Sequence, residues 1–251
     1  MGIFIGILEE GLIYAILALG VLITYRILDF PDLTVDSSFP LGAAVSAILT
    51  VNGMHPVLTL LMATLAGAAA GLVTGLIHVK CHVRDLLSGI ITMTGLYSIN
   101  LRIAGRANLP FFNMDTLFDN ALVDSFPAAL APWSKVLVVL VIVLVVKVIL
   151  DLFMNTKAGF LLRAEGDNPA VVATLARDGG LVKIEGLIIA NALVALSGAV
   201  MAQKNRVFEI SMGTGAIVFG LAAVIIGTNI FKNRQKVNSS TAAIIGSIIY
   251  K

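Results

Sequence analysis

Residues 133–153 have the sequence WSKVLVVLVIVLVVKVILDLF, and within them Val136–Val146 is apolar without interruption. A helix needs about 20 mostly apolar residues to cross the hydrocarbon core of a bilayer. Residues 133–153 have that length, so they predict a transmembrane helix. The whole chain agrees, because 58% of its residues are hydrophobic and only 13% are charged, whereas a soluble domain carries about 25% charged residues. This composition excludes a soluble enzyme.

Apolar segments of similar character occur along the rest of the chain. They are residues 3–28, 39–51, 56–78, 86–104, 186–202, 213–231 and 242–250. The last of them is too short to cross a bilayer, so we expect either a span truncated by the chain end or a tail that packs at the interface. The sequence therefore predicts an all-α fold, a polytopic transmembrane helix bundle of about seven or eight spans, the last one truncated. We expect a single transmembrane domain over residues 1–251, placed as a multi-pass protein in the cytoplasmic membrane.

The basic residues predict the orientation of the bundle, because Lys and Arg collect in cytoplasmic loops. If the loop with Lys80 and Arg84 lies inside, alternation of the spans places the loop of residues 155–185 inside as well. The N-terminus then lies outside, and the inner loops hold more Lys and Arg than the outer ones. The net charge of +2 gives no sign of nucleic-acid binding.

Glycines recur at helical spacing in two of the apolar segments. They are Gly67, Gly71 and Gly75 in residues 56–78, and Gly220 and Gly227 in residues 213–231. Small residues let the backbones of membrane helices approach closely. These glycines therefore predict helix packing, either within the chain or along the seam of a homodimer.

The segment at residues 86–104 is the most polar of the spans. Its polar residues recur at steps of three and four, which places them on one helix face. The members of this stripe are Ser88, Thr92, Ser98 and Arg102, and Asn191 adds a polar side chain in a later span. Because polar groups are costly in hydrocarbon, we expect them to face protein or water. Two interpretations stay open: interhelical hydrogen bonding and the lining of a translocation path.

The loop at about residues 155–185 is too long for a simple connection between two membrane helices. Within it, the sequence Gly166-Asp167-Asn168-Pro169 predicts a helix start, with a capping side chain followed by proline. The predicted helix continues to Ala176 and is ended by Gly179 and Gly180. A short apolar helix outside the spans predicts either a docking site for another protein or a helix lying flat on the membrane.

Several motifs resemble one family of transport proteins. Residues 8–44, with YAILALG at 14–20 and FPLGAA at 39–44, resemble the N-terminal part of permeases from the branched-chain amino-acid and ribose class of ABC importers. Residues 159–180 look like the coupling loop of those permeases, and residues 211–227 look like one of their late core helices. The stretches DFPDLTVD at 29–36 and TMTGLYSINLR at 92–102 are most similar to the subgroup of tryptophan/tyrosine uptake permeases.

This resemblance implies a dimer around a central path, working by alternating access. It implies a cytoplasmic ATP-binding subunit that uses the ATP, an extracytoplasmic solute-binding protein that delivers an amino acid, possibly aromatic, and no cofactor bound by this chain. The residues that the resemblance assigns to ATPase coupling are Arg163, Glu165, Asp167, Asn168, Pro169, Ala170, Val171, Ala173 and Leu175. The long loop at residues 105–132 is expected to form an outer interfacial helix or part of the dock for the binding protein.

The rival function is a self-sufficient secondary transporter or channel. Against it, no predicted span carries an acid or a histidine at mid-membrane depth that indicates a proton relay. The acidic turn at residues 29–36 is, without the family, expected to be a solvated loop. A membrane enzyme is a weaker third hypothesis, because the sequence has no metal-ligand cluster and no Ser/His/Asp arrangement, hence no catalytic or metal-binding residues. The sequence also lacks the GxxxxGK[ST] phosphate loop that an ATPase of that type needs.

Overall fold

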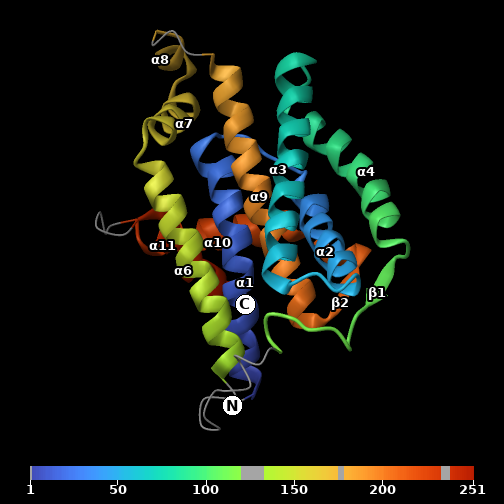
Figure 1. Ribbon diagram of the computed structural model, residues 1–251. Helices are drawn as coiled ribbons and strands as arrows, with labels where there is room; N and C mark the ends of the chain where they lie inside the picture. Colours follow the sequence, from blue (N-terminus) through green and yellow to red (C-terminus); the bar gives the residue numbers. More distant parts are fainter. Residues whose placement is uncertain (1, 120–132, 175–177, 233–237) are drawn as a thin grey trace.

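The computed structural model describes residues 2–119, 133–174, 178–232 and 238–251 (Figure 1). Its helices and strands, in chain order, are α1 (Gly2–Val21), the π-helix η1 (Leu22–Ile27), α2 (Val35–Val51), α3 (Pro56–Lys80), α4 (Asp85–Ala104), β1 (Asn108–Pro110), α6 (Ser134–Met154), α7 (Lys157–Asp167), α8 (Pro169–Thr174), α9 (Gly179–Asn205), β2 (Val207–Glu209), the 3-10 helix η3 (Ile210–Gly213), α10 (Ala216–Ile230) and α11 (Ser239–Tyr250).

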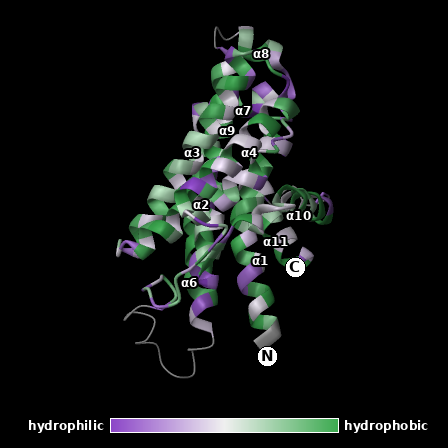
Figure 2. Cartoon of the chain, turned by 90° about the vertical axis from the view of Figure 1, so that its right-hand side faces the viewer, coloured by the Kyte–Doolittle hydropathy of each residue, from purple (hydrophilic) through white to green (hydrophobic). Residues whose placement is uncertain are grey.

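Six helical segments in this part of the chain are long and apolar enough to cross a membrane. They are Phe4–Ile27, α3, α4, α6, α9 and Ile210–Ile230, while α2 and α11 are shorter apolar helices. Hydrophobic residues also cover much of the outside of these helices (Figure 2). Leu65, Ile149 and Leu152, for example, are each more than half exposed. Lipid rather than water is the solvent for such faces, and the predicted all-α membrane bundle is confirmed.

The bundle has two distinct ends (Figure 1). Helices α7 and α8 lie at one of them, next to the start of α9, and we call this the hairpin end. The N-terminus and the strands β1 and β2 lie at the other, which we call the ribbon end. The two strands pair antiparallel, with Leu109 opposite Phe208. The residue pattern does not predict this short ribbon.

Helix α9 contacts α1, α2 and α3. On α3, the glycines of the predicted stripe face it. A Cβ at Gly71 would overlap the carbonyl oxygen of Leu187, and a Cβ at Gly75 would lie 2.9 Å from Cγ1 of Ile184. At Gly67 the added carbon would meet the backbone of Asn191. Close backbone approach of this kind holds membrane helices together through van der Waals contact.

The glycines of α10 also pack inside the chain. Gly220 lies against Leu17 and Val21 of α1, and Gly227 lies against the backbone of Ala242 in α11. Intrachain packing therefore accounts for all five predicted packing glycines. The space beside each of them is occupied by this chain and is not open to a second copy.

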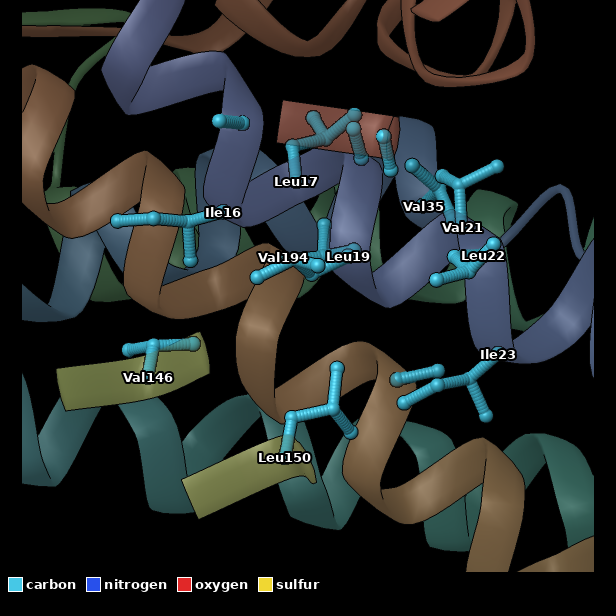
Figure 3. Packing of buried hydrophobic residues seen from close by; sticks show 14 of the residues in the cluster. Ile16, Leu17, Leu19, Val21, Leu22, Ile23, Val35, Val146, Leu150 and Val194 are labelled. Carbon is cyan, nitrogen blue, oxygen red and sulfur yellow. The ribbon is translucent and has the colours of Figure 1, made fainter. Parts of the chain in front are cut away.

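The central core joins the first span to α6 and α9 (Figure 3). Leu22 and Ile23 of η1, Val194 of α9, and Val146 and Leu150 of α6 all belong to this one buried cluster. Burial of such side chains anchors the end of the first span, which leads directly into the acidic turn.

The start of α9 differs from the prediction. Gly179 and Gly180 do not end the preceding helix but open α9. The carboxylate of Asp178 accepts a hydrogen bond from the backbone N–H of Gly180 at 2.9 Å, which satisfies one of the free donors of the first turn. The predicted start at residue 186 is therefore too late, because two glycines are typical of a helix end, whereas here the capping aspartate in front of them makes them a helix start.

Candidate functional site

Two short helices at the hairpin end form the first candidate site. The Thr156 side chain caps α7 by accepting from the N–H of Gly159 at 3.4 Å. Asn168 then breaks the helix with extended backbone, and its Oδ1 accepts from the N–H of Ala170 at 3.1 Å. Pro169 occupies the first position of α8. The predicted helix start at Asn168-Pro169 is confirmed, whereas the residue pattern did not predict α7.

Most of the residues predicted for ATPase coupling lie on the outside of this hairpin. The exposed ones are Arg163, Asp167, Asn168, Pro169, Ala170, Val171 and Ala173. Val172, which was not among them, is buried and anchors α8. Leu175 and the predicted end of the helix at Ala176 lie outside the described residues. The hairpin therefore offers a surface of small and apolar side chains with charges beside it.

Glu165 occupies a different position from the other predicted coupling residues. It is buried and faces α9, where its Oε1 lies 3.8 Å from the ammonium nitrogen of Lys183. A Cβ at Gly179 would lie 2.6 Å from its Oε2, so the carboxylate sits against the first turn of α9. A negative charge is favourable at the N-terminus of a helix. Glu165 thus attaches the hairpin to α9 and is not part of the exposed surface.

The acidic turn between η1 and α2 forms the second candidate site, and the expectation of a solvated loop is wrong. Asp29 is exposed, but Asp32 is only 1% exposed. The side-chain amide of Asn191 donates to Oδ2 of Asp32 at 2.7 Å, and the N–H of Thr34 donates to Oδ1 at 2.9 Å. Asn191 lies halfway along α9. An acid is therefore buried at the middle of the bundle, although no predicted span contains it.

A wider set of hydrogen bonds surrounds this carboxyl group. The Ser38 hydroxyl donates to Oδ1 of Asn191 at 2.7 Å, and the hydroxyls of Thr34 and Thr74 lie 2.9 Å apart. We call Asp32, Thr34, Ser38, Thr74 and Asn191 the buried polar network. Its members come from the turn, α2, α3 and α9. Networks in which every member is satisfied favour one arrangement of the helices.

Asp36, at the end of the same turn, is bonded to α10. Its carboxylate accepts from the N–H of Ile217 at 2.9 Å and from that of Gly215 at 3.3 Å. Gly215, at the start of α10, has a positive φ of 81° and no side chain to cap the helix. Asp36 therefore acts as the cap of α10 from a distant place in the sequence.

The predicted polar stripe of α4 divides into two parts. Ser88 and Thr92 are buried, and their hydroxyls donate to backbone carbonyls of α4 itself. Ser98 and Arg102 are exposed. Asn100, which does not belong to the stripe, is fully buried, and its amide donates to the carbonyl oxygen of Ser37 at 3.0 Å. Polar side chains therefore lie on both the buried and the exposed side of α4, and on the exposed side they stand among apolar ones such as Ile91 and Ile99.

At the ribbon end, Gln203 joins three elements. Its amide nitrogen donates to Oγ1 of Thr59 at 2.8 Å, to the carbonyl oxygen of Pro56 at 3.1 Å and to Oγ of Ser46 at 3.2 Å. Its oxygen accepts from the N–H of Leu117 at 3.1 Å. This fully buried side chain fixes α2, α3 and the loop after β1 to the end of α9.

Comparison with known proteins adds a family to this geometry. Residues 3–251 match the family model described as the permease component of the branched-chain amino acid transport system. A protein of Clostridioides difficile (strain R20291) named tyrosine transport system permease protein is 43% identical over 247 residues, which cover 98% of this chain and 80% of that protein.

Two further relatives are more distant. An uncharacterised protein of Rickettsia prowazekii is 34% identical over all of this chain and 87% of that protein. A probable branched-chain amino acid transport permease protein, LivH, of Methanocaldococcus jannaschii is 27% identical over 88% of this chain and 73% of that protein. No solved structure matches this chain.

Proposed function

Because this chain belongs to the family of permease components of branched-chain amino acid transport systems, we propose that it moves an amino acid inward with energy from a separate ATP-hydrolysing subunit. The hairpin α7–α8 is the cytoplasmic docking site for that subunit. The cargo is an aromatic amino acid, and the relative named as a tyrosine transport permease supports this choice.

The exposed surface of the hairpin is the observation that carries the proposal. Val171 is 45% exposed on α8, and Ala170 and Ala173 are exposed beside it. Helix α8, which carries these three residues, lies at the hairpin end of the bundle in Figure 1 and is too short to cross a membrane. Exposed apolar surface of this kind marks sites of protein contact. The sequence contains no GxxxxGK[ST] loop, so ATP hydrolysis of that type requires a partner.

The exposed face of α4 supports a second copy of the chain around the path. Among the six candidate spans α4 is the least apolar, although most of its residues are not buried inside the chain. Thr94, Ser98 and Arg102 are all exposed on it. Polar groups facing lipid are unfavourable, so this face needs protein or water against it. In the proposed dimer the α4 helices line the translocation path, and ATP-driven movement of the hairpins opens it to one side at a time.

A carrier that works alone is the second candidate function, and Asp32 is the observation that favours it. A buried acid at the middle of a membrane bundle is the kind of group that proton relays use. Asp32, however, is hydrogen-bonded on both oxygens to this chain and is 1% exposed. This arrangement supports a structural role for Asp32 in the proposed importer.

The test is capture and uptake with the Ala173→Asp variant. We expect the full chain to co-purify with its ATP-binding subunit and, with the solute-binding protein, to take up tyrosine into proteoliposomes only when ATP is supplied. Ala173→Asp places a charge on the apolar surface and should abolish capture of the ATP-binding subunit. The matched control is Ala107→Asp, the same change at an exposed site of the ribbon end. Uptake by the purified chain alone without ATP, or normal capture by Ala173→Asp, would refute the proposal.

A further inference from the structure

The hairpin touches the rest of the bundle at one unusually close contact. Gly166 lies one residue before the end of α7, and its backbone packs on the last residue of η1. A Cβ added there would overlap the carbonyl oxygen of Ile27 and lie 3.1 Å from Cα of Leu28. Both neighbouring atoms belong to backbone, so they cannot move aside as a flexible side chain can. Only glycine fits this position.

The side chain of Leu28 continues the contact. It is buried, and it fills the space between α7 and α9. A Cβ at Gly186 of α9 would overlap Cδ1 of Leu28 and lie 3.0 Å from Cδ2 of Leu162 in α7. Leu28 therefore lies tightly packed between α7 of the hairpin and α9. A displacement of α7 must displace Leu28 with it.

The segment directly before Leu28 is the π-helix η1, and Leu28 is its C-cap. The N–H of Leu28 donates to the carbonyl oxygen of Ile23 at 2.9 Å, and that of Phe30 donates to Thr24 at 2.8 Å. Asp29, between them, adopts a left-handed conformation with a φ of 51°, which is uncommon for a residue with a side chain. Single π-turns inside membrane helices are uncommon and often mark functional positions. The first span thus ends in a π-helix, and the last residue of this π-helix, Ile27, makes the contact with the hairpin.

The chain runs from this contact into the buried polar network. Four residues after Leu28, Asp32 is bonded to Asn191 of α9, and Thr34 is bonded to Thr74 of α3. Asp36 then caps α10. One continuous segment therefore links the hairpin to three of the helices. Packed side chains and hydrogen-bond networks of this kind carry energetic coupling between distant sites.

We propose that Gly166 is a positioning residue for transport, through which movement of the hairpin is delivered to the turn at residues 28–34 and on to the Asp32–Asn191 pair. This inference rests on the proposed docking role of the hairpin and adds the route by which docking acts on the bundle. The close contact of Gly166 with Ile27, the tightly packed Leu28 and the hydrogen bonds of Asp32 carry it. Glu165 contributes a parallel attachment of α7 to α9.

The experiment compares Gly166→Ala with Gly95→Ala in the full chain. Gly95 has no atom within 4 Å of an added Cβ, so its variant makes the same chemical change without a clash. In the first arm, hydrogen exchange of the chain alone is followed in peptides covering residues 22–38. We expect Gly166→Ala to speed exchange of these amides about tenfold, which corresponds to about 1.4 kcal/mol, and Gly95→Ala to leave it unchanged.

The second arm uses the complex with the ATP-binding subunit and measures amino-acid uptake per ATP hydrolysed. A purely structural defect lowers amino-acid uptake and ATP hydrolysis in proportion. Loss of the coupling through Gly166 instead lowers the amount of amino acid taken up per ATP hydrolysed. We expect the ratio to fall about tenfold in Gly166→Ala. The control in this arm is Gly6→Ala on α1, because its added Cβ also meets no atom within 4 Å and Gly6 does not lie on the face of α4 that lines the proposed path; its ratio should stay at the wild-type value. If Gly166→Ala does not fold, Leu28→Val, which removes one methylene from this packed side chain, takes its place in both arms.

The outcomes separate the two proposals. If the wild-type chain binds no ATP-binding subunit, the proposed function fails, and the exchange arm alone decides whether the hairpin acts on the turn. If exchange of residues 22–38 and the uptake ratio are both unchanged in a folded Gly166→Ala or Leu28→Val variant, the route through Gly166 is refuted.

Discussion

Replacement of Asn191 by leucine tests the buried polar network most sharply. The asparagine is 0% exposed and makes two hydrogen bonds to side chains outside its own helix, with Asp32 and Ser38. Leucine has the same number and branching of side-chain heavy atoms as asparagine, so it can fill the space, but it has no polar atoms. Asn191→Leu therefore removes the bonds with little change in packing and leaves Oδ2 of Asp32 and the hydroxyl of Ser38 without their partner.

The expected loss of stability follows from these two groups. In water-soluble proteins an orphaned buried group costs about 1–3 kcal/mol. Hydrogen bonds between membrane helices are weaker, about 0.6 kcal/mol on average and about 1.7 kcal/mol at most, because separated helices find other partners in the membrane. Both bonds of Asn191 are short, at 2.7 Å. They belong at the upper end of the membrane range, so we expect a loss of about 2–3 kcal/mol in the free energy of unfolding.

The assay is reversible unfolding of the full chain in mixed detergent micelles, followed by circular dichroism. The control is Ser197→Ala on the same helix, which removes one hydrogen bond, from the serine hydroxyl to the carbonyl oxygen of Ile13 at 2.7 Å. We expect this control to lose about 0.6 kcal/mol. If Asn191→Leu is no more destabilising than Ser197→Ala, the network does not hold the helices together and the reasoning fails.

Two more substitutions test single features of the bundle by the same unfolding assay. Gly71→Ala should lower the free energy of unfolding by about 1–3 kcal/mol, because its Cβ would overlap the backbone of Leu187. Gly95→Ala should leave it unchanged or raise it slightly. Equal effects of the two variants would contradict the close contact of α3 with α9. Asp36→Ala should lower the free energy of unfolding by about 1 kcal/mol and speed hydrogen exchange at residues 215–219, because the start of α10 loses its cap. Unchanged exchange at these residues would show that the cap is unimportant.

The spans were predictable because membrane crossing imposes a length and an apolar composition that any sequence must display. The helix of residues 133–153 needs no other information, since it is mostly apolar over 21 residues and is observed as α6 (Ser134–Met154). The start of α8 was predictable too. Asn168 and Pro169 carry a local signal that depends on the backbone of the next turn alone.

The acidic turn was not predictable in this way, because burial of Asp32 depends on partners far away in the sequence. Asn191, its partner, lies 159 residues further on. A hydropathy pattern assigns such a charged stretch to solvent. The sequence does contain one usable signal, since Thr34, Ser37 and Ser38 follow Asp32 closely. Small hydroxyl residues beside an acid, between two apolar segments, are typical of a buried hydrogen-bonded turn.

The polar residues of α4 show the same limit. Periodicity identifies which residues share a face, but it does not tell which face is covered by the chain. Asn100 was set aside by its spacing and is fully buried, whereas Ser98 and Arg102 were placed in the stripe and are exposed. Their role in a translocation path stays a prediction.

The central claim, that the hairpin is held by a separate ATP-hydrolysing subunit in the cytoplasm, is tested most directly by disulfide cross-linking from Ala173→Cys. The one native cysteine, Cys81, is exposed and is first replaced by serine. The account predicts that the new thiol is alkylated only from the inner side of sealed vesicles and forms a cross-link with single cysteines on the ATP-binding subunit. Alkylation from the outer side, or the absence of any cross-link in a complex that transports, would contradict it.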